Sequence, residues 1–200
     1  MKNIVKGLAF LLCFFVFACG PSSQSEQGGE ADQTEETETT TTDTTEEPKE
    51  DKSSRPSPPK EAIGQIGGID IKIDYSSPAV KGRTIWGDLE PYGEVWRTGA
   101  NEATTIEVSQ DVTIEGQTLP AGRYALFTIP NKDKWTVIFN TEADQWGDYN
   151  YDEEKDALRV EVVPSALEEQ IERLEFMVRE GDVALRWDLL EVAFKVGAAG

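Results

Sequence analysis

The stretch IDIKIDY, from Ile69 to Tyr75, decides the fold class of this chain. Its apolar side chains alternate one by one with charged side chains, and this period of two predicts a β-strand that buries one face and exposes the other. Residues 124–129, YALFTI, are apolar on both faces, which is typical of a strand in the middle of a sandwich. The two stretches together predict an all-β domain with a buried centre.

Turn signals divide the rest of the domain into short strands. The dipeptide Glu115-Gly116 interrupts the apolar residues of 112–119 and predicts a hairpin there. A change of phase at Leu189-Leu190 predicts a β-bulge within one long strand. We expect a β-sandwich of about eight or nine mostly antiparallel strands.

Residues 166–173 fit this pattern least well. Leu167, Ile171 and Leu174 have helical spacing, whereas the residues after Leu174 alternate as in a strand. One short helix near 166–173 is therefore an alternative for this segment.

The first 18 residues resemble a secretory signal. Lys2 and Lys6 give the first six residues a positive charge. The apolar run at residues 8–16 that follows is too short to span a bilayer as a permanent helix. Residues 16–19, VFAC, are similar to the lipobox of bacterial lipoproteins, with Phe in place of the usual smaller residue. We expect a signal peptide at 1–18 and lipidation, palmitate included, at Cys19, with an ordinary signal peptide as the alternative.

Residues 19–62 have the composition of a disordered acidic tether. The stretch after Cys19 is rich in threonine, proline and acidic residues and contains no aromatic residue, so it cannot form a core. Residues 63–200 are then expected to form a single β-sandwich domain, long enough to bury a core without disulfides or metal. The tether would hold this domain away from the lipid anchor in the cell envelope, which we expect to be the outer membrane.

The composition excludes several classes of function. The formal net charge is −19, and an acidic domain repels phosphate backbones, so we expect no nucleic-acid partner. The chain has no histidine, and its two cysteines are Cys13 in the leader and Cys19. The domain therefore lacks a Ser-His-Asp triad and a cysteine nucleophile, and we predict no metal, no cofactor and no catalytic residue.

A series of short motifs runs in order through residues 75–164. The motifs are YSSP at 75–78, WRTGANEAT at 96–104, PAGRY at 120–124, FTIP at 127–130, WTVIFN at 135–140, QWG at 145–147 and YNY at 149–151. Together they resemble the bacterial envelope family catalogued as domain of unknown function 2911. The resemblance implies an exported protein with a β-rich domain, and it implies no mechanism, because the family has no assigned activity.

The segment from Trp96 to Glu102 is the first candidate site. Arg97 can bond a carboxylate with two hydrogen bonds, and Asn101 can both donate and accept, so Trp96, Arg97, Asn101 and Glu102 are candidates for a ligand cleft. The structural alternative is that Arg97 pairs with Glu102 while Asn101 holds a tight loop at Gly99.

The loop of residues 144–156 is the second candidate site. Trp146, Tyr149 and Tyr151 can stack on a sugar ring, and the polar residues between them can bond its hydroxyls. The alternative is that these aromatic side chains cover an open end of the core. The start of the loop is similar to a calcium-binding loop, but Glu153 and Arg159 stand where an EF-hand requires glycine and glutamate.

Two functions from different classes follow from these candidates. The first is a lipid-anchored envelope protein that binds a glycan or an envelope partner protein, and we favour this function, which is not enzymatic. The alternative is a carboxylate-dependent glycoside hydrolase that uses Glu102 together with Asp144 or Asp148.

Overall fold

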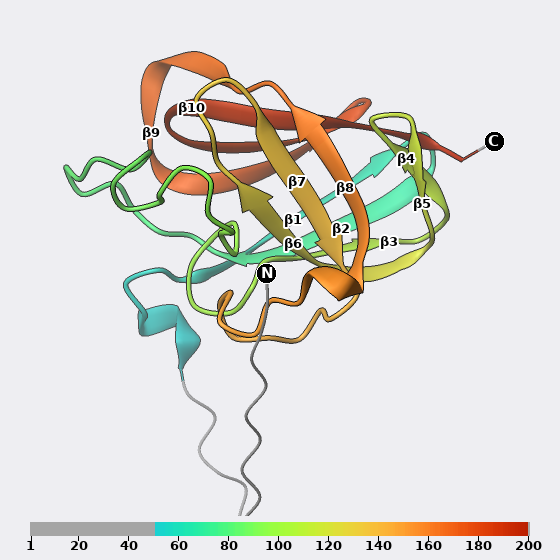
Figure 1. The fold of residues 1–200 in the computed structure, drawn as a ribbon, viewed down its shortest axis with the longest axis horizontal. Helices are drawn as coiled ribbons and strands as arrows, with labels where there is room; N and C mark the ends of the chain where they lie inside the picture. The colour runs from blue at the N-terminus through green and yellow to red at the C-terminus, as the bar shows by residue number, and fades with distance from the viewer. Residues whose placement is uncertain (1–50, 200) are drawn as a thin grey trace, which may run out of the picture. The chain divides into compact units, whose positions relative to one another are not determined.

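The computed structural model describes residues 51–199, which form two packed antiparallel sheets (Figure 1). The β-sandwich predicted from the alternating stretches is confirmed, with ten strands rather than eight or nine. Apart from two short 3-10 turns, η1 (Lys52–Ser54) and η2 (Glu153–Lys155), the described chain contains no helix. None of the described residues forms a helix long and apolar enough to cross a membrane.

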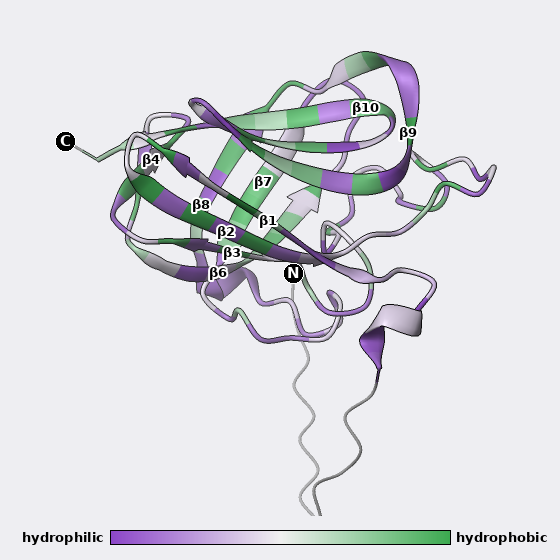
Figure 2. Ribbon diagram, turned by 180° about the vertical axis from the view of Figure 1, so that it is seen from behind, coloured by the Kyte–Doolittle hydropathy of each residue, from purple (hydrophilic) through white to green (hydrophobic). Residues whose placement is uncertain are grey.

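The larger sheet contains six strands in the order β1-β2-β3-β6-β7-β8. The strands are β1 (Pro59–Ile66), β2 (Ile69–Ser76), β3 (Thr105–Val108), β6 (Gly122–Ile129), β7 (Trp135–Asn140) and β8 (Asp156–Val162). In β2 the isoleucines predicted to face the core are buried, and the charged residues between them lie on the outer face. Hydrophilic and hydrophobic bands therefore alternate along this strand (Figure 2).

The smaller sheet contains four strands in the order β5-β4-β10-β9. The strands are β4 (Val112–Ile114), β5 (Gln117–Leu119), β9 (Ser165–Arg179) and β10 (Asp182–Ala198). Glu115 and Gly116 both have positive φ, so the predicted hairpin turns where expected. The pairing of β10 with β9 shifts register between Asp188 and Leu190, which confirms the predicted irregularity in the long strand.

The inner faces of the two sheets enclose the main core. Its centre is a cluster of four tryptophans, Trp86, Trp96, Trp135 and Trp187, in which five of the ring pairs have centroids 4.9–6.3 Å apart. Trp135 and Trp187 are fully buried. Rings at these separations contribute packing energy beyond the area they bury, so this cluster fastens the two sheets to each other.

The outer face of the larger sheet carries a second, smaller core. Phe127, Ala125 and Ile138 point away from the main core and are buried beneath loops, where Ala103 and Tyr151 pack on them. This explains why residues 124–129 are apolar on both faces: one face lies between the sheets and the other lies beneath the loops that follow β2 and β7.

The alternative of a short helix over residues 166–173 is wrong, because these residues lie within β9. From Glu175 to Ile171 β9 uses four residues while β10 uses only two, from Arg186 to Asp188. The extra residues bulge outward, so Leu167 and Ile171 are partly buried while their neighbours are exposed. Bulges in a strand have produced the spacing that a helix would give.

The folded part begins before the predicted start at residue 63. Pro59 to Ala62 pair with Ser76 to Ile73 as the first half of β1, and the backbone N–H of Ser77 donates to the carbonyl oxygen of Pro58 at 2.9 Å. Backbone pairing does not depend on side-chain hydrophobicity, and proline and charged residues are tolerated at a sheet edge. Composition alone therefore assigned residues 51–62 to the tether incorrectly. The predicted signal peptide, the lipidated Cys19 and the tether up to residue 50 lie outside the described residues.

Candidate functional site

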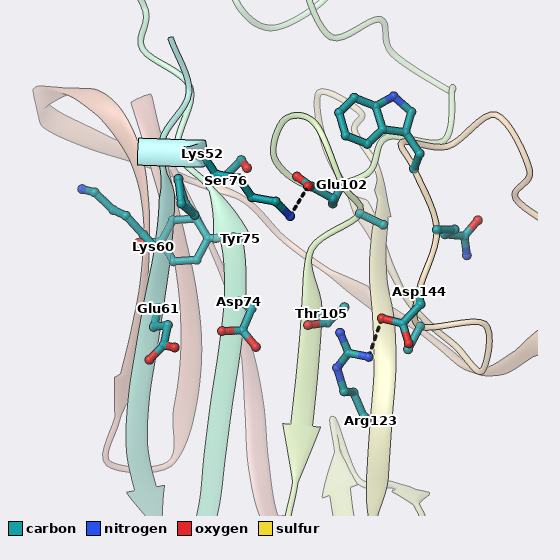
Figure 3. A pocket seen from close by; sticks show the side chains of 15 residues that line it. Lys52, Lys60, Glu61, Asp74, Tyr75, Ser76, Glu102, Thr105, Arg123 and Asp144 are labelled. Atoms are coloured by element: carbon teal, nitrogen blue, oxygen red, sulfur yellow. Dashed lines mark hydrogen bonds and ion pairs between the residues drawn. The ribbon is translucent and has the colours of Figure 1, made fainter. Parts of the chain in front are cut away.

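A cleft of about 750 Å³ lies on the outer face of the larger sheet, beside the loop that follows β7. Strands β1, β2, β3 and β6 form its floor, and the residues around Glu102 and Trp146 form its rim. The charged side chains of the floor and rim are shown in Figure 3. The cleft occupies the open part of this outer face, and the second core occupies the other part.

The floor of the cleft is a row of polar side chains on adjacent strands. Glu61 pairs in register with Asp74, and Asp74 pairs with Thr105, so the three residues lie side by side across β1, β2 and β3. Arg123 on β6 donates to Asp144 at 2.7 Å, which joins the floor to the wall (Figure 3). The paired strands hold the backbone of these residues in place, so a ligand meets polar groups that are already positioned to bond it.

Glu102 and Trp146 are brought together by a short antiparallel pairing of two loops. The N–H of Ala103 donates to the carbonyl of Gln145, and the N–H of Gly147 donates to the carbonyl of Asn101, both at 3.0 Å. Glu102 and Trp146 form the bridge between these bonds. Trp146 as a whole residue remains 52% exposed, which is unusual for so large an apolar residue and leaves part of its ring available to a ligand.

Lys52 and Arg55 hold the carboxylate of Glu102. The Nζ of Lys52 donates to Glu102 at 2.7 Å, and Nη1 of Arg55 donates to both carboxylate oxygens at 3.0 and 3.1 Å. Burial by itself would raise the pKa of Glu102, but the bonds from Lys52 and Arg55 outweigh it and lower the pKa to about 2. Glu102 is therefore ionised throughout the physiological range.

Each carboxylate among the described residues that line the cleft is paired with a basic side chain. Glu61 and Asp74 both pair with Lys72, Asp144 pairs with Arg123, and Glu102 has a depressed pKa. A glycosidase needs one carboxyl with a raised pKa to protonate the leaving group. The arrangement instead presents fixed charges and an aromatic ring, which suit binding.

The predicted pairing of Arg97 with Glu102 is wrong. The nearest carboxylate to Arg97 is that of Asp148, with Nη1 and Oδ1 3.7 Å apart. Glu90 lies in the same environment: burial raises its pKa to about 7, against the attraction of Arg97 and with the repulsion of Asp148. The cleft lining does not include Arg97, Glu90 or Asp148. Arg97 is therefore not positioned to bind a ligand in the cleft.

Trp96 and Asn101 have structural positions. Trp96 is only 3% exposed within the tryptophan cluster and cannot contact a ligand, which corrects its assignment as a site residue. Asn101 holds a loop, as the structural alternative expects, but its partners are the carbonyl of Ser57 at 3.0 Å and the hydroxyl of Ser76 at 3.1 Å. Its positive φ of 61° suits asparagine in such a turn.

The three aromatic candidates of the second loop have separate environments. Trp146 lines the cleft, whereas Tyr149 is 78% exposed and lies outside the cleft lining. Tyr151 packs its ring edge against Phe127 at 5.0 Å and donates to Asp156 at 2.6 Å. Tyr151 therefore covers the second core, and burial together with Asp156 raises the pKa of its phenol to about 12.

The acidic residues of this loop do not gather around a cation. Asp152 accepts from the backbone N–H of Glu154 and caps η2, while Asp148 lies near Arg97. Within residues 51–199 no group of three or more carboxylate, histidine or cysteine side chains is arranged to hold a metal ion.

None of the site residues predicted from the sequence lies on the floor of the cleft or supplies its basic side chains. Asp74, Thr105 and Arg123 point outward from the neighbouring strands β2, β3 and β6. The alternation of inward and outward residues along each strand would have identified them once the order of the strands was known. Lys52 and Arg55 gave no signal, because they stand in a stretch whose composition is that of the tether.

Comparison with known proteins adds a family and no activity. The family model described as protein of unknown function (DUF2911) matches residues 57–196, which include all ten strands apart from the last two residues of β10. No curated protein and no solved structure shows a significant match.

Proposed function

The chain belongs to the family of proteins of unknown function DUF2911, and from the geometry of its cleft we propose that it is a binding module that takes a saccharide. The observation that carries this proposal is the exposed ring of Trp146 at the rim of a cleft with a polar floor. Sugars are recognised by stacking one apolar face on an aromatic ring while fixed polar groups bond the hydroxyls.

The polar groups of the cleft suit hydroxyl ligands. Carboxylates accept hydrogen bonds from hydroxyls, and the guanidinium of Arg123 and the hydroxyl of Thr105 can donate to them. The cleft volume of about 750 Å³ accommodates a ligand of two or three sugar rings, on the usual scale of pockets. The ionised state of Glu102 and the pairing of the other carboxylates favour binding over hydrolysis.

The proposal is tested by calorimetric titration of the purified protein with neutral, N-acetylated and amino-bearing oligosaccharides of equal length. We expect at least one class to bind, and Trp146→Ala to weaken that binding by about 10-fold or more, since stacking on an exposed ring supplies roughly 1–3 kcal/mol. Tyr149→Ala is the matched control, because it removes an exposed aromatic from the same loop but outside the cleft. Equal losses in both variants, or no binding by any class, would contradict a saccharide cleft; a protein ligand captured by the Trp146 face would favour an envelope partner instead.

The location that fits this function is the bacterial cell envelope. We propose that the protein is exported and lipid-anchored through Cys19, which places the cleft where glycans of the envelope are accessible. The support is the signal-like leader and the lipobox-like residues 16–19.

Lipidation has a direct test. Cells grown with labelled palmitate should incorporate it into the wild-type protein and not into Cys19→Ala, which should leave the membrane fraction or remain an uncleaved precursor. The serine variant Cys19→Ser distinguishes loss of the thiol from loss of size, and we expect it to behave as the alanine variant does. Equal labelling of all three forms would exclude the anchor.

A further inference from the structure

Two positive side chains from the chain itself bond Glu102 at the rim of the cleft: Lys52 lines the cleft, and Arg55 reaches Glu102 from beside it. We call residues 52–58 the strap, because they run past the cleft before β1 begins. Lys52 and Arg55 both bond Glu102, and the guanidinium carbon of Arg55 lies 5.7 Å from the ring centroid of Trp146. The side chain of Arg55 is only 14% exposed, so it is enclosed by the site rather than free in solvent.

The second half of the strap is fastened to the domain through its backbone. The carbonyl oxygen of Ser57 accepts from Asn101, and that of Pro58 accepts from the N–H of Ser77. Lys52 and Arg55 reach Glu102 through long, rotatable side chains instead. They can therefore leave the cleft by side-chain motion while residues 57–58 stay in place.

Glu102 and Trp146 together have the chemistry of a cation site. A carboxylate attracts an ammonium or guanidinium group through charge-assisted hydrogen bonds, and the face of an indole attracts the same group through its quadrupole. The structure shows this pair holding cations of its own chain. A ligand that takes their place has to supply a positive charge, because otherwise Glu102 is left buried in part without its partners.

We propose that Glu102 and Trp146 form a subsite for the ammonium group of an amino-bearing saccharide, and that Lys52 and Arg55 occupy this subsite until such a ligand displaces them. The inference rests on the proposed function, since it names the ligand class of the same cleft. The sugar ring then stacks on Trp146 while its ammonium replaces the strap at Glu102. A cleft lined by four carboxylates and three basic side chains has a slight negative excess, which favours the same ligand.

The test compares oligomers of glucosamine with oligomers of N-acetylglucosamine of the same length, because the two differ in charge and share the same ring. At physiological salt the wild-type protein should bind the glucosamine oligomer more tightly. In the double variant Lys52→Ala/Arg55→Ala the subsite is vacant, so the affinity for the glucosamine oligomer should rise by about 10-fold while that for the N-acetylated oligomer changes little. Glu102→Gln should abolish the preference for the charged oligomer.

A second double variant controls for overall charge. Lys132→Ala/Lys134→Ala likewise removes two positive charges, but from a separate pocket beside Tyr92 and Glu161, and should leave the affinity for glucosamine oligomers unchanged within about 2-fold. An equal gain in both double variants would show general attraction to an acidic protein and overturn the proposal. Equal binding of the two oligomers to the wild-type protein and the strap variant would overturn the ammonium subsite and leave the saccharide cleft standing. Failure of every oligomer to bind would overturn both.

The conservative change Arg55→Lys gives an independent check. It keeps the positive charge and loses the planar guanidinium, so the strap should still compete and the affinity should stay close to that of the wild type. A gain as large as that of the alanine double variant would mean that the strap acts through the shape of Arg55 and not through its charge, which would contradict an exchange of one cation for another.

Discussion

The outer face of the larger sheet has a covered half and an open half. At Ala125, Phe127 and Ile138 of β6 and β7 the outward residues are apolar, and loops bury them beneath Tyr151 and Ala103. On β1, β2 and β3 the outward residues that line the cleft are polar or charged, as at Glu61, Asp74 and Thr105. The comparison shows how one sheet face serves two purposes. Loops pack on its apolar residues and stabilise the fold, and we call these loops the loop cover. Polar residues on the same paired strands stay accessible to a ligand.

The covered half should carry the largest loss of stability. Phe127 is fully buried beneath the loops, and Phe127→Ala should lower the free energy of unfolding by about 3–5 kcal/mol because it leaves a cavity in the second core. The measurement is urea unfolding at constant m-value. Glu61→Ala on the open half is the control and should cost less than about 1 kcal/mol, because the side chain of Glu61 is 52% exposed. Similar losses in the two variants would erase the distinction between the halves.

The fastening of the loop cover should give the next largest effect. The side chain of Asp156 is 7% exposed and accepts from Asn140 at 2.8 Å, Tyr151 at 2.6 Å and Arg159 at 2.6 Å. Asp156→Ala leaves these donors without their acceptor and should cost about 2–3 kcal/mol. Tyr151→Phe removes one of the bonds and keeps the ring, so a loss of about 1 kcal/mol is expected. A larger loss for Tyr151→Phe than for Asp156→Ala would show that the carboxylate is not the centre of this network.

The pH dependence of the free energy of unfolding should reveal the raised pKa of Glu90. Burial raises its pKa in the folded protein to about 7, above its ordinary value of 4.5, so the folded state binds the proton more tightly than the unfolded state does. This contribution is complete below about pH 4.5 and is lost as the pH rises through 7. Glu90→Gln should therefore stabilise the protein at pH 8 by roughly 1–2 kcal/mol and hardly at pH 4.5. An equal effect of the substitution at both pH values would rule out a raised pKa.

The open half should give the smallest loss of stability. Trp146 is half exposed, so Trp146→Ala should change the free energy of unfolding by less than about 1 kcal/mol, in contrast to its expected effect on binding. Thermal unfolding of the variant beside Trp187→Ala, which removes a fully buried ring of the tryptophan cluster, makes the contrast direct. A loss as large as that of Trp187→Ala would make Trp146 a core residue and remove it from the site.

Local patterns predicted the sheets well, because alternation and turn residues report on single strands. The stretch from Ile69 to Tyr75, the hairpin at Glu115-Gly116 and the irregularity near Leu189 all follow from neighbours in sequence. The helical spacing of residues 166–173 misled, because bulges in β9 reproduce it, and only pairing with β10 distinguishes the two. Local patterns do not contain that pairing.

The site was predicted only in part, because local patterns do not show which distant segments come together. Glu102 and Trp146 were recognisable as polar and aromatic residues of two motifs, and the cleft does bring them together. Their actual partners, Lys52 and Arg55, come from a stretch about 50 residues earlier whose composition resembles a tether. Trp96 was misplaced because a tryptophan beside polar residues has the same local signature on a surface and in a core.

The most direct test of a saccharide cleft at Trp146 uses the five tryptophans of the chain as reporters. Each indole N–H gives a resolved signal in a nitrogen–proton NMR spectrum, and Trp146→Phe assigns the signal of interest. On titration with a glucosamine oligomer the account predicts a progressive, saturable shift of the Trp146 signal, with much smaller changes for the four tryptophans of the core cluster. A Trp146 signal that stays in place up to high ligand concentration, or shifts confined to the core tryptophans, would contradict it.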